Sequence, residues 1–228
     1  MIGKLYLVST PIGNYDDITL RALNILKSVD FIICEEFKEA RRLLSHYKIP
    51  EKELVSLNEH NEKDAIINDL ILDFFEGKSA ALISDCGTPL FSDPGHLLVE
   101  VCISQDIDVV PVPGANSILP ALTGSGLNIE KFFYYGWLSP KKDIRRQELL
   151  KLRLLNEVVV IMDTPYRLKS LLEDVVKILG KNLKIVVAFQ LTMENEKFYR
   201  GTAEEILSIA TKTNLKGEFV VLLNLGRR

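Results

Sequence analysis

Residues 80–95, AALISDCGTPLFSDPG, join an apolar run to a long turn. The first four residues, from Ala80 to Ile83, have the uninterrupted apolar character of a strand buried in a parallel sheet. The residues that follow include two prolines and two glycines, which fix backbone dihedrals or allow close backbone approach. Because ligands in open α/β sheets bind beyond the carboxyl ends of the strands, this turn predicts a ligand site.

Short β-branched runs alternate with helical patterns around this stretch, which predicts an α/β fold whose first half is mainly a parallel sheet. Asp17 is expected to cap one helix, and a second helix is expected over residues 62–76, ending at Gly77. The strands expected in this half cover residues 4–10, 31–34, 54–57, 79–83 and 108–112.

The second half has a less regular pattern and predicts a mixed sheet. Strands are expected over 132–138, 157–162, 184–190, 196–200 and 219–225, and helices over 144–155, 165–179 and 202–210. The two strands nearest in sequence, 184–190 and 196–200, predict an antiparallel hairpin. Pro165 suits a first helical turn, and Thr202 with Glu205 forms a capping-box pattern. The Pro-rich segment VPVPGANS, 110–117, places the domain boundary, so the expected domains are 1–114 and 115–228.

Composition restricts the class of protein. A formal net charge of -3 argues against coating nucleic acid by bulk charge, so that any nucleic-acid site must be local. The three widely spaced cysteines, Cys34, Cys86 and Cys102, predict reduced and mostly buried thiols. No apolar run approaches the ~18 residues of a membrane span. We therefore expect a soluble, cytoplasmic protein with no membrane partner.

Three expected strands end in similar turns, STPIGN at 9–14, SDCGTPLFSDPG at 84–95 and PVPGANSI at 111–118. One such turn is more often a tight connection, but three at one sheet edge favour a ligand site. The chain has no P-loop, and GSGLNI at 124–129 lacks the third glycine of a dinucleotide fingerprint. The three histidines lack ligand spacing, so no metal is expected. Covalent catalysis is not expected either, because Glu35 and Glu36 disfavour a thiolate at Cys34.

Five motifs resemble the tetrapyrrole methylase superfamily: LYLVSTPIGNYDDITLRAL (5–23), EHNE (59–62), ISDCGTPLFSDPG (83–95), VPVPGANSILPALTGSGL (110–127) and KGEFVVLL (216–223). The resemblance implies two α/β domains, a cofactor cleft between them and a homodimer. It also implies S-adenosylmethionine as cofactor. Within the superfamily the chain is most similar to enzymes that methylate the ribose 2'-hydroxyl of a cytidine in 16S rRNA, which makes this RNA or the small ribosomal subunit the implied partner.

The resemblance also implies which residues bind the cofactor. They come from the three turns and from two apolar positions of the second domain. The set is Pro11, Gly13, Asp85, Gly87, Thr88, Leu90, Phe91, Ser92, Ser117, Ile118, Leu138 and Leu191.

Methyl transfer from a sulfonium needs alignment and removal of the hydroxyl proton, so the candidate catalytic groups are the carboxylates Glu35, Asp85 and Glu194. RNA phosphates need cations. Lys142, Arg145, Arg146 and Arg167 are the candidates, the first three at helical spacing on one face. A solvated helix start explains those three equally well.

Several segments depart from the family pattern, among them GWLS at 136–139 and Pro165-Tyr166-Arg167, and two others lose charged residues. Residues 35–38, EEFK, stand where glutamate-aspartate-threonine-arginine is usual, and residues 189–193, FQLTM, replace arginine-glutamate-leucine-threonine-lysine. Two alternatives therefore stay open. The chain could use the same cofactor with another acceptor, a small molecule or a different RNA, or it could be a non-catalytic paralogue that binds cofactor or ribosome.

Overall fold

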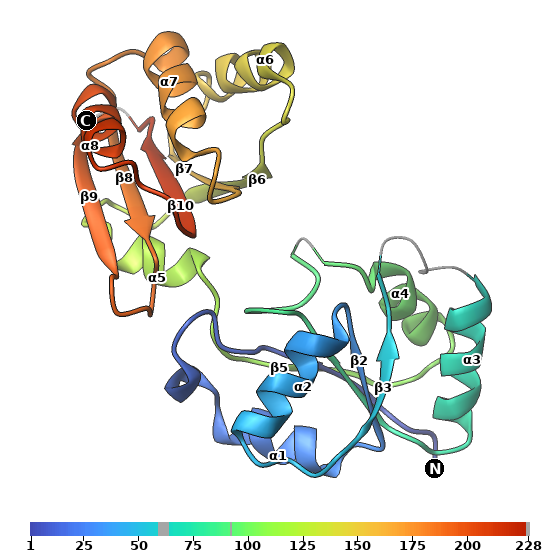
Figure 1. Cartoon of the computed structure of the whole chain (residues 1–228). Coiled ribbons are helices and arrows are strands. Elements are labelled where there is room, and N and C mark those ends of the chain that lie inside the picture. Colours follow the sequence, from blue (N-terminus) through green and yellow to red (C-terminus); the bar gives the residue numbers. More distant parts are fainter. Residues whose placement is uncertain (59–63, 92, 227–228) are drawn as a thin grey trace. The chain divides into compact units, whose positions relative to one another are not determined.

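A computed structural model describes residues 1–58, 64–91 and 93–226 (Figure 1). Residue contacts divide the chain into two units, Met1–Asn116 and Ser117–Arg228. Each unit contains a five-stranded sheet.

The sheet of the first unit is parallel throughout, as predicted. Its strands follow the order β3-β2-β4-β1-β5. All four residues of β2 and of β4 are buried, because these strands are covered on both faces. The apolar run from Ala80 to Ile83 is β4, in the middle of the sheet. The strand bounds are β1 Leu5–Val8, β2 Phe31–Cys34, β3 Glu53–Ser56, β4 Ala80–Ile83 and β5 Val109–Val112.

Two pairs of helices cover this sheet (Figure 1). One apolar cluster packs α1, Leu20–Ser28, and α2, Phe37–His46, on one face, and a second cluster packs α3, Asp64–Phe75, and α4, His96–Ser104, on the other.

The prediction that Asp17 caps a helix is wrong. Asp17 ends the short 3-10 helix η1, Tyr15–Asp17, and the side chain of Thr19 caps α1 by accepting from the backbone N–H of Ala22 at 3.1 Å. Thr19 has the extended backbone that an N-cap requires and lies directly before the helix.

The second unit has the predicted mixed sheet, with strand order β6-β7-β10-β8-β9. Only β6 and β7 pair in parallel, and β8 and β9 form the predicted antiparallel hairpin. The strand bounds are β6 Phe132–Trp137, β7 Val158–Asp163, β8 Lys184–Phe189, β9 Lys197–Thr202 and β10 Phe219–Asn224.

The described residues of this unit, 117–226, form four helices: α5 Ile118–Thr123, α6 Lys142–Leu152, α7 Leu168–Leu179 and α8 Ala203–Lys212. The last three share one apolar cluster with the sheet. The predicted capping box at Thr202 and Glu205 is confirmed. Pro165, however, is not in the first turn of α7, because the helix begins at Leu168 with Arg167 as N-cap.

Within the described ranges no helix has the length and apolar character needed to cross a membrane. All three cysteines are free thiols. Cys34 and Cys102 are buried as expected, whereas Cys86 is exposed in the turn after β4.

Candidate functional site

The turns after β1 and β4 are joined by main-chain hydrogen bonds. The N–H of Thr10 donates to the carbonyl of Gly87 at 2.8 Å, and the N–H of Gly87 donates to the carbonyl of Thr10 at 3.1 Å. The Thr10 hydroxyl adds a bond to the carbonyl of Ser84 at 3.3 Å. The two turns therefore form one unit at the carboxyl edge of the sheet, where parallel strands place ligand sites.

The hydroxyl of Thr88 extends this unit to the turn after β5. Thr88 Oγ1 donates to the carbonyl of Ala115 at 3.2 Å and lies 2.9 Å from Ser9 Oγ. A carbonyl only accepts, so the Thr88 hydrogen points to Ala115 and Ser9 donates to Thr88. One threonine side chain thus connects all three predicted turns.

Close packing and unusual dihedrals fix the shape of these turns. A Cβ on Gly114 would lie 2.8 Å from Ser9 Cβ, so only glycine fits there. Gly87 has φ +82°, and Leu90 has φ +75°, a left-handed conformation that costs a residue with a Cβ about 1–2 kcal/mol. Such strained conformations persist where many surrounding contacts hold the backbone in place, and they are found mostly at functional sites.

The predicted cofactor residues of the first unit lie on these turns. Pro11 and Gly87 are buried, Thr88 and Leu90 are half-buried, and Gly13, Asp85 and Phe91 are exposed. The N–H of Gly87 is already used by Thr10, so this glycine shapes the turn through its backbone conformation. Ser92 and the EHNE motif lie outside the described residues.

Two aspartates of the β4 turn have raised pKa values. Partial removal of the carboxyl from water is the main cause at both Asp85, which is exposed as a whole residue, and Asp93, which is half-buried. Neighbouring carboxylates add to the shift at both. A backbone hydrogen bond from Glu36 opposes the shift at Asp85 and joins the β4 turn to the start of α2. Burial raises the pKa of the Cys34 thiol to about 11, and Asp85 adds to this shift. Cys34 is therefore a neutral thiol near pH 7, as predicted.

The other two candidate bases are placed differently. Glu35 is half-buried directly after β2, and its carbonyl accepts from the hydroxyl of Ser56 at 3.2 Å. Glu194 is exposed in the hairpin segment between β8 and β9, in the second unit.

One edge of the second sheet holds two of the predicted residues of the second unit. The register pairs Asp163 with Phe219 and Phe219 with Phe189 across three neighbouring strands. Leu138 directly follows β6 and Leu191 closely follows β8, so both lie at this edge, and both are buried. Ser117 and Ile118 form the start of α5.

Three of the four predicted RNA-binding cations are held by buried acids. Asp174, on α7, pairs with Arg145 at 2.6 Å and with Arg146 at 2.7 Å. The Arg145 side chain is only 6% exposed, so it lies inside the unit and not on the expected outward-facing basic surface. Lys142 is exposed.

Arg167 takes part in a second ion pair, with Asp163 at the end of β7. Its Nη2 also donates to the carbonyls of Leu138 and Ser139, both at 3.1 Å. The Asp163 side chain is fully buried, and its Oδ2 has no hydrogen-bond partner among the described residues. Burial raises the pKa of this carboxyl, while Thr164 and Arg167 partly oppose the shift.

Neither buried aspartate was singled out from the sequence. A signal existed for Asp174, because it interrupts the apolar face of α7, where a charge indicates a buried partner. Within the described ranges, no group of three or more histidine, cysteine or carboxylate side chains could hold a metal ion.

Comparison with known proteins agrees with this architecture. The chain matches Tetrapyrrole (Corrin/Porphyrin) Methylases over residues 4–207. Ribosomal RNA small subunit methyltransferase I of Halalkalibacterium halodurans is 42% identical over 97% of this chain and 75% of that protein. The protein of the same name from Thermotoga maritima is 40% identical over 98% of this chain and 99% of the relative.

Solved structures share the fold at lower identity. Diphthine synthase superposes with a TM-score of 0.74 at 15% identity, covering 97% of this chain and 89% of that one. Uroporphyrin-III C-methyl transferase from Thermus thermophilus, complexed with S-adenyl homocysteine, gives 0.66 at 17% identity and 97% coverage of both chains. With its family match over residues 4–207 and relatives of about 40% identity along nearly its whole length, the chain belongs to the tetrapyrrole methylase family.

Proposed function

We propose that this chain is an S-adenosylmethionine-dependent methyltransferase that methylates the ribose 2'-hydroxyl of a cytidine in 16S rRNA. The observation that carries the proposal is the hydrogen-bonded assembly of three turns through Thr88, in a chain similar over 97% of its length to a ribosomal RNA small subunit methyltransferase I. A rigid array of main-chain groups suits a cofactor recognised mainly by its shape and its polar edges.

The cofactor contacts that we propose in the first unit are those of the three turns. They are supplied by Pro11, Gly13, Asp85, Gly87, Thr88, Leu90, Phe91 and Ser92. In the second unit, Ser117, Ile118, Leu138 and Leu191 complete the set.

Bound S-adenosylmethionine supplies an electrophilic methyl group and leaves as a neutral thioether. The protein must align the ribose oxygen with that methyl group and accept the hydroxyl proton. We assign the proton to Asp85, which lies on the central turn; Glu35 and Glu194 are the alternatives. A raised pKa makes its carboxylate a stronger base than an ordinary aspartate.

Exposed cations on α2 support RNA as the acceptor. This helix follows β2, the neighbour of β4, so it begins at the same sheet edge as the Asp85 turn. Lys38, Arg41 and Arg42 are exposed, and Arg41 lies over the exposed Phe37 ring at 5.5 Å. Lys38 lies in the first turn of α2, where a cation opposes the helix dipole, so an anionic partner would favour it there. On the second unit, we propose RNA contacts for Lys142, Arg146 and Arg167, with Arg145 as structural support.

The test is methyl transfer to unmodified 16S rRNA, followed by nucleoside mass analysis. We expect one ribose-methylated cytidine with the wild-type protein. At saturating S-adenosylmethionine, Asp85→Asn should slow the transfer at least about a hundredfold, which is typical of losing a general base. Calorimetry that detects no binding of S-adenosylmethionine would overturn the proposal. Binding without RNA methylation would favour another acceptor or a non-catalytic role.

The edge strand β6 supports a homodimer, which we propose as the working form in the cytoplasm. Its Phe132, Phe133 and Trp137 side chains are 39–42% exposed. Exposed aromatic residues on an edge strand are typical of an interface. Light scattering should show a dimer for the wild-type protein and a monomer for Phe133→Glu.

A further inference from the structure

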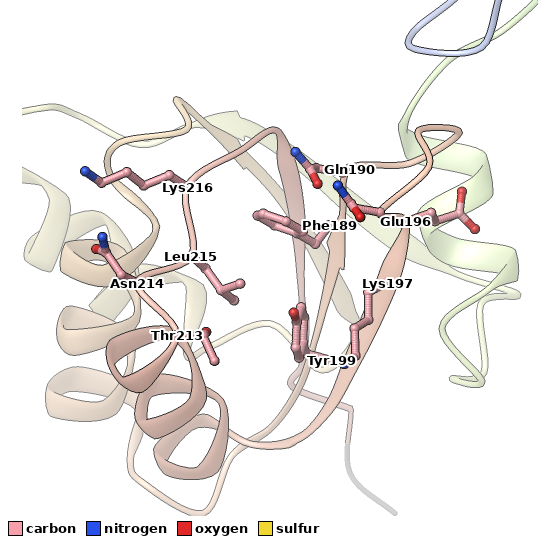
Figure 2. Close-up of a pocket in the computed structure, with 10 residues that line it drawn as sticks. Phe189, Gln190, Glu196, Lys197, Tyr199, Thr213, Asn214, Leu215 and Lys216 are labelled. Atoms are coloured by element: carbon pink, nitrogen blue, oxygen red, sulfur yellow. The ribbon is translucent and has the colours of Figure 1, made fainter.

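A shallow hollow of about 510 Å³ lies in the second unit, between the β8–β9 hairpin and the segment that joins α8 to β10 (Figure 2). Its apolar part is formed by Phe189, Tyr199 and Leu215. The two aromatic rings meet edge to face, with centroids 6.2 Å apart at 73°. Phe189 is only 6% exposed, so the accessible ring is that of Tyr199, and an exposed aromatic ring can pack against a planar group such as a nucleobase.

One lysine stands beside this apolar part and a second lies on the rim. Lys197 extends along β9 with its ammonium 5.2 Å from the centre of the Tyr199 ring, and Lys216 extends from the opposite segment, away from Phe189 and Tyr199 (Figure 2). Among the described residues, neither lysine forms an ion pair with a carboxylate. The carboxylate of Glu196 accepts the N–H of Thr192 at 2.6 Å and so caps the hairpin turn. With two lysines and this one carboxylate among its lining residues, the hollow has a net charge of +1.

Side-chain amides complete the rim, and the backbone holds two of them in unusual conformations. Gln190 has φ +49° and Asn214 has φ +48°. The N–H of Gln190 donates to the carbonyl of Glu218 at 2.8 Å, which fixes its backbone. A Cβ on Gly217 would lie 2.8 Å from Gln190 Nε2, so this glycine permits the close approach. The conformation of Asn214 is the left-handed one that commonly ends a helix, here α8, where the N–H of Leu215 donates to the carbonyl of Ala210 at 3.2 Å. The fold therefore holds both amides at fixed positions on the rim.

We propose that this hollow binds a single-stranded segment of the RNA substrate outside the methylated nucleotide. Lys197 and Lys216 contact phosphates, the amides of Gln190 and Asn214 bind base edges, and a base packs against Tyr199. Cations beside an aromatic surface, with amides on the rim, are the combination by which proteins bind unpaired RNA. This inference rests on the proposed function and adds a second RNA contact to it.

The first test compares two double variants with the same change in charge. Lys197→Gln with Lys216→Gln removes both cations of the hollow, and Lys169→Gln with Lys177→Gln removes two exposed lysines of α7. Each phosphate contact on single-stranded RNA contributes about 0.7 to the magnitude of the slope of log K against log salt concentration. The slope measured for the hollow variant should therefore be smaller by about 1.4, and this variant should bind 16S rRNA about tenfold more weakly near 0.15 M salt. The α7 variant should bind like the wild-type protein. Equal affinities and slopes for the two variants would overturn the inference.

The second test uses Tyr199. Tyr199→Thr removes the ring while keeping a residue that favours strands, and should weaken RNA binding about 5- to 150-fold. Tyr199→Phe should bind RNA like the wild-type protein. Both variants should bind S-adenosylmethionine normally in calorimetry, which also checks that they are folded.

The outcomes separate this inference from the proposed function. If the wild-type protein methylates 16S rRNA and the hollow variants bind this RNA as tightly as the wild-type protein does, only the inference about the hollow is overturned. Wild-type protein that neither binds nor methylates RNA would overturn both. The hollow variants could instead bind intact small subunits more weakly and bind free 16S rRNA as the wild-type protein does. That result would show that the hollow contacts a ribosomal protein, and it would overturn the proposed RNA contact.

Discussion

Arg145 and Asp174 form a buried ion pair that connects α6 to α7. One carboxylate oxygen, Asp174 Oδ2, accepts from Arg145 Nε at 2.9 Å and from Nη2 at 2.6 Å, and the other accepts from Arg146 Nε at 2.7 Å. Arg145 Nη1 also donates to the carbonyl of Pro140 at 3.3 Å. The pair therefore fixes the segment that leads from β6 into α6, next to Leu138.

Replacing Asp174 by alanine should lower the free energy of unfolding by about 3–5 kcal/mol, because it leaves the buried Arg145 without a counter-charge. Urea denaturation monitored by circular dichroism measures the effect. Glu173→Ala is the matched control, since this neighbour is exposed and should change stability by less than about 0.5 kcal/mol.

A double variant, Arg145→Met with Asp174→Leu, tests the cause of that loss. Replacing both charges by apolar groups of similar size removes the unpaired cation, so it should recover most of the stability. A single Asp174→Ala variant as stable as the wild-type protein would contradict the structural role of the pair.

Gly87 tests whether the shape of the β4 turn matters beyond stability. Gly87 and Gly126 have similar φ angles, +82° and +77°, but an added Cβ would lie 3.2 Å from Ile12 Cγ2 only at Gly87 and would meet nothing within 4 Å at Gly126. Both alanine variants should lose about 1–2 kcal/mol from the left-handed backbone. Only Gly87→Ala should also bind S-adenosylmethionine more weakly, by at least about tenfold. Equal binding by the two variants would remove the β4 turn from the cofactor site.

Local patterns predicted the fold well because each strand is a short apolar run that both faces of a sheet bury. β2, with all four residues buried, was predicted with its observed bounds. Helix starts were harder, since capping depends on backbone conformation. Asp17 and Thr19 both have side chains that can cap, but only Thr19 directly precedes the helix in an extended conformation.

The candidate site was only partly predictable. The turns could be found from their prolines and glycines, but the connection through Thr88 joins residues separated by 79 and 27 positions, which no local pattern reveals. Similarly, the spacing of Arg145 on α6 placed it correctly on a helix, but its burial depends on an acid 29 residues away.

Asp163 predicts a pH dependence of stability. Its pKa in the folded protein is raised, mainly by burial, so the native state holds a proton that the unfolded state releases near pH 4. The contribution of Asp163 to the free energy of unfolding is greatest at a pH below the pKa of this group in the unfolded state. It decreases as the pH rises through the pKa of the group in the folded state. The wild-type protein should therefore lose stability relative to Asp163→Asn as the pH rises from about 4.

Denaturation of both proteins across that range isolates this effect. Asp85, Asp93 and Glu218 also have raised pKa values, but they are present in both proteins and cancel in the difference. A difference that stays constant with pH, or that grows in favour of the wild-type protein, would contradict the assignment of a raised pKa to Asp163.

Thr88→Val should disturb the site most selectively, because it keeps the side-chain shape and removes only the bridging hydroxyl. Ser9 is buried, so its hydroxyl would lose its partner at a cost of about 1–3 kcal/mol. Affinity for S-adenosylmethionine, measured by calorimetry, should fall about tenfold because the β4 turn loses its side-chain bonds to Ser9 and Ala115, whereas Thr88→Ser should retain it. Thr123→Val removes an exposed hydroxyl on α5 and should change neither quantity. Wild-type affinity in Thr88→Val would show that the turns hold the cofactor without this connection.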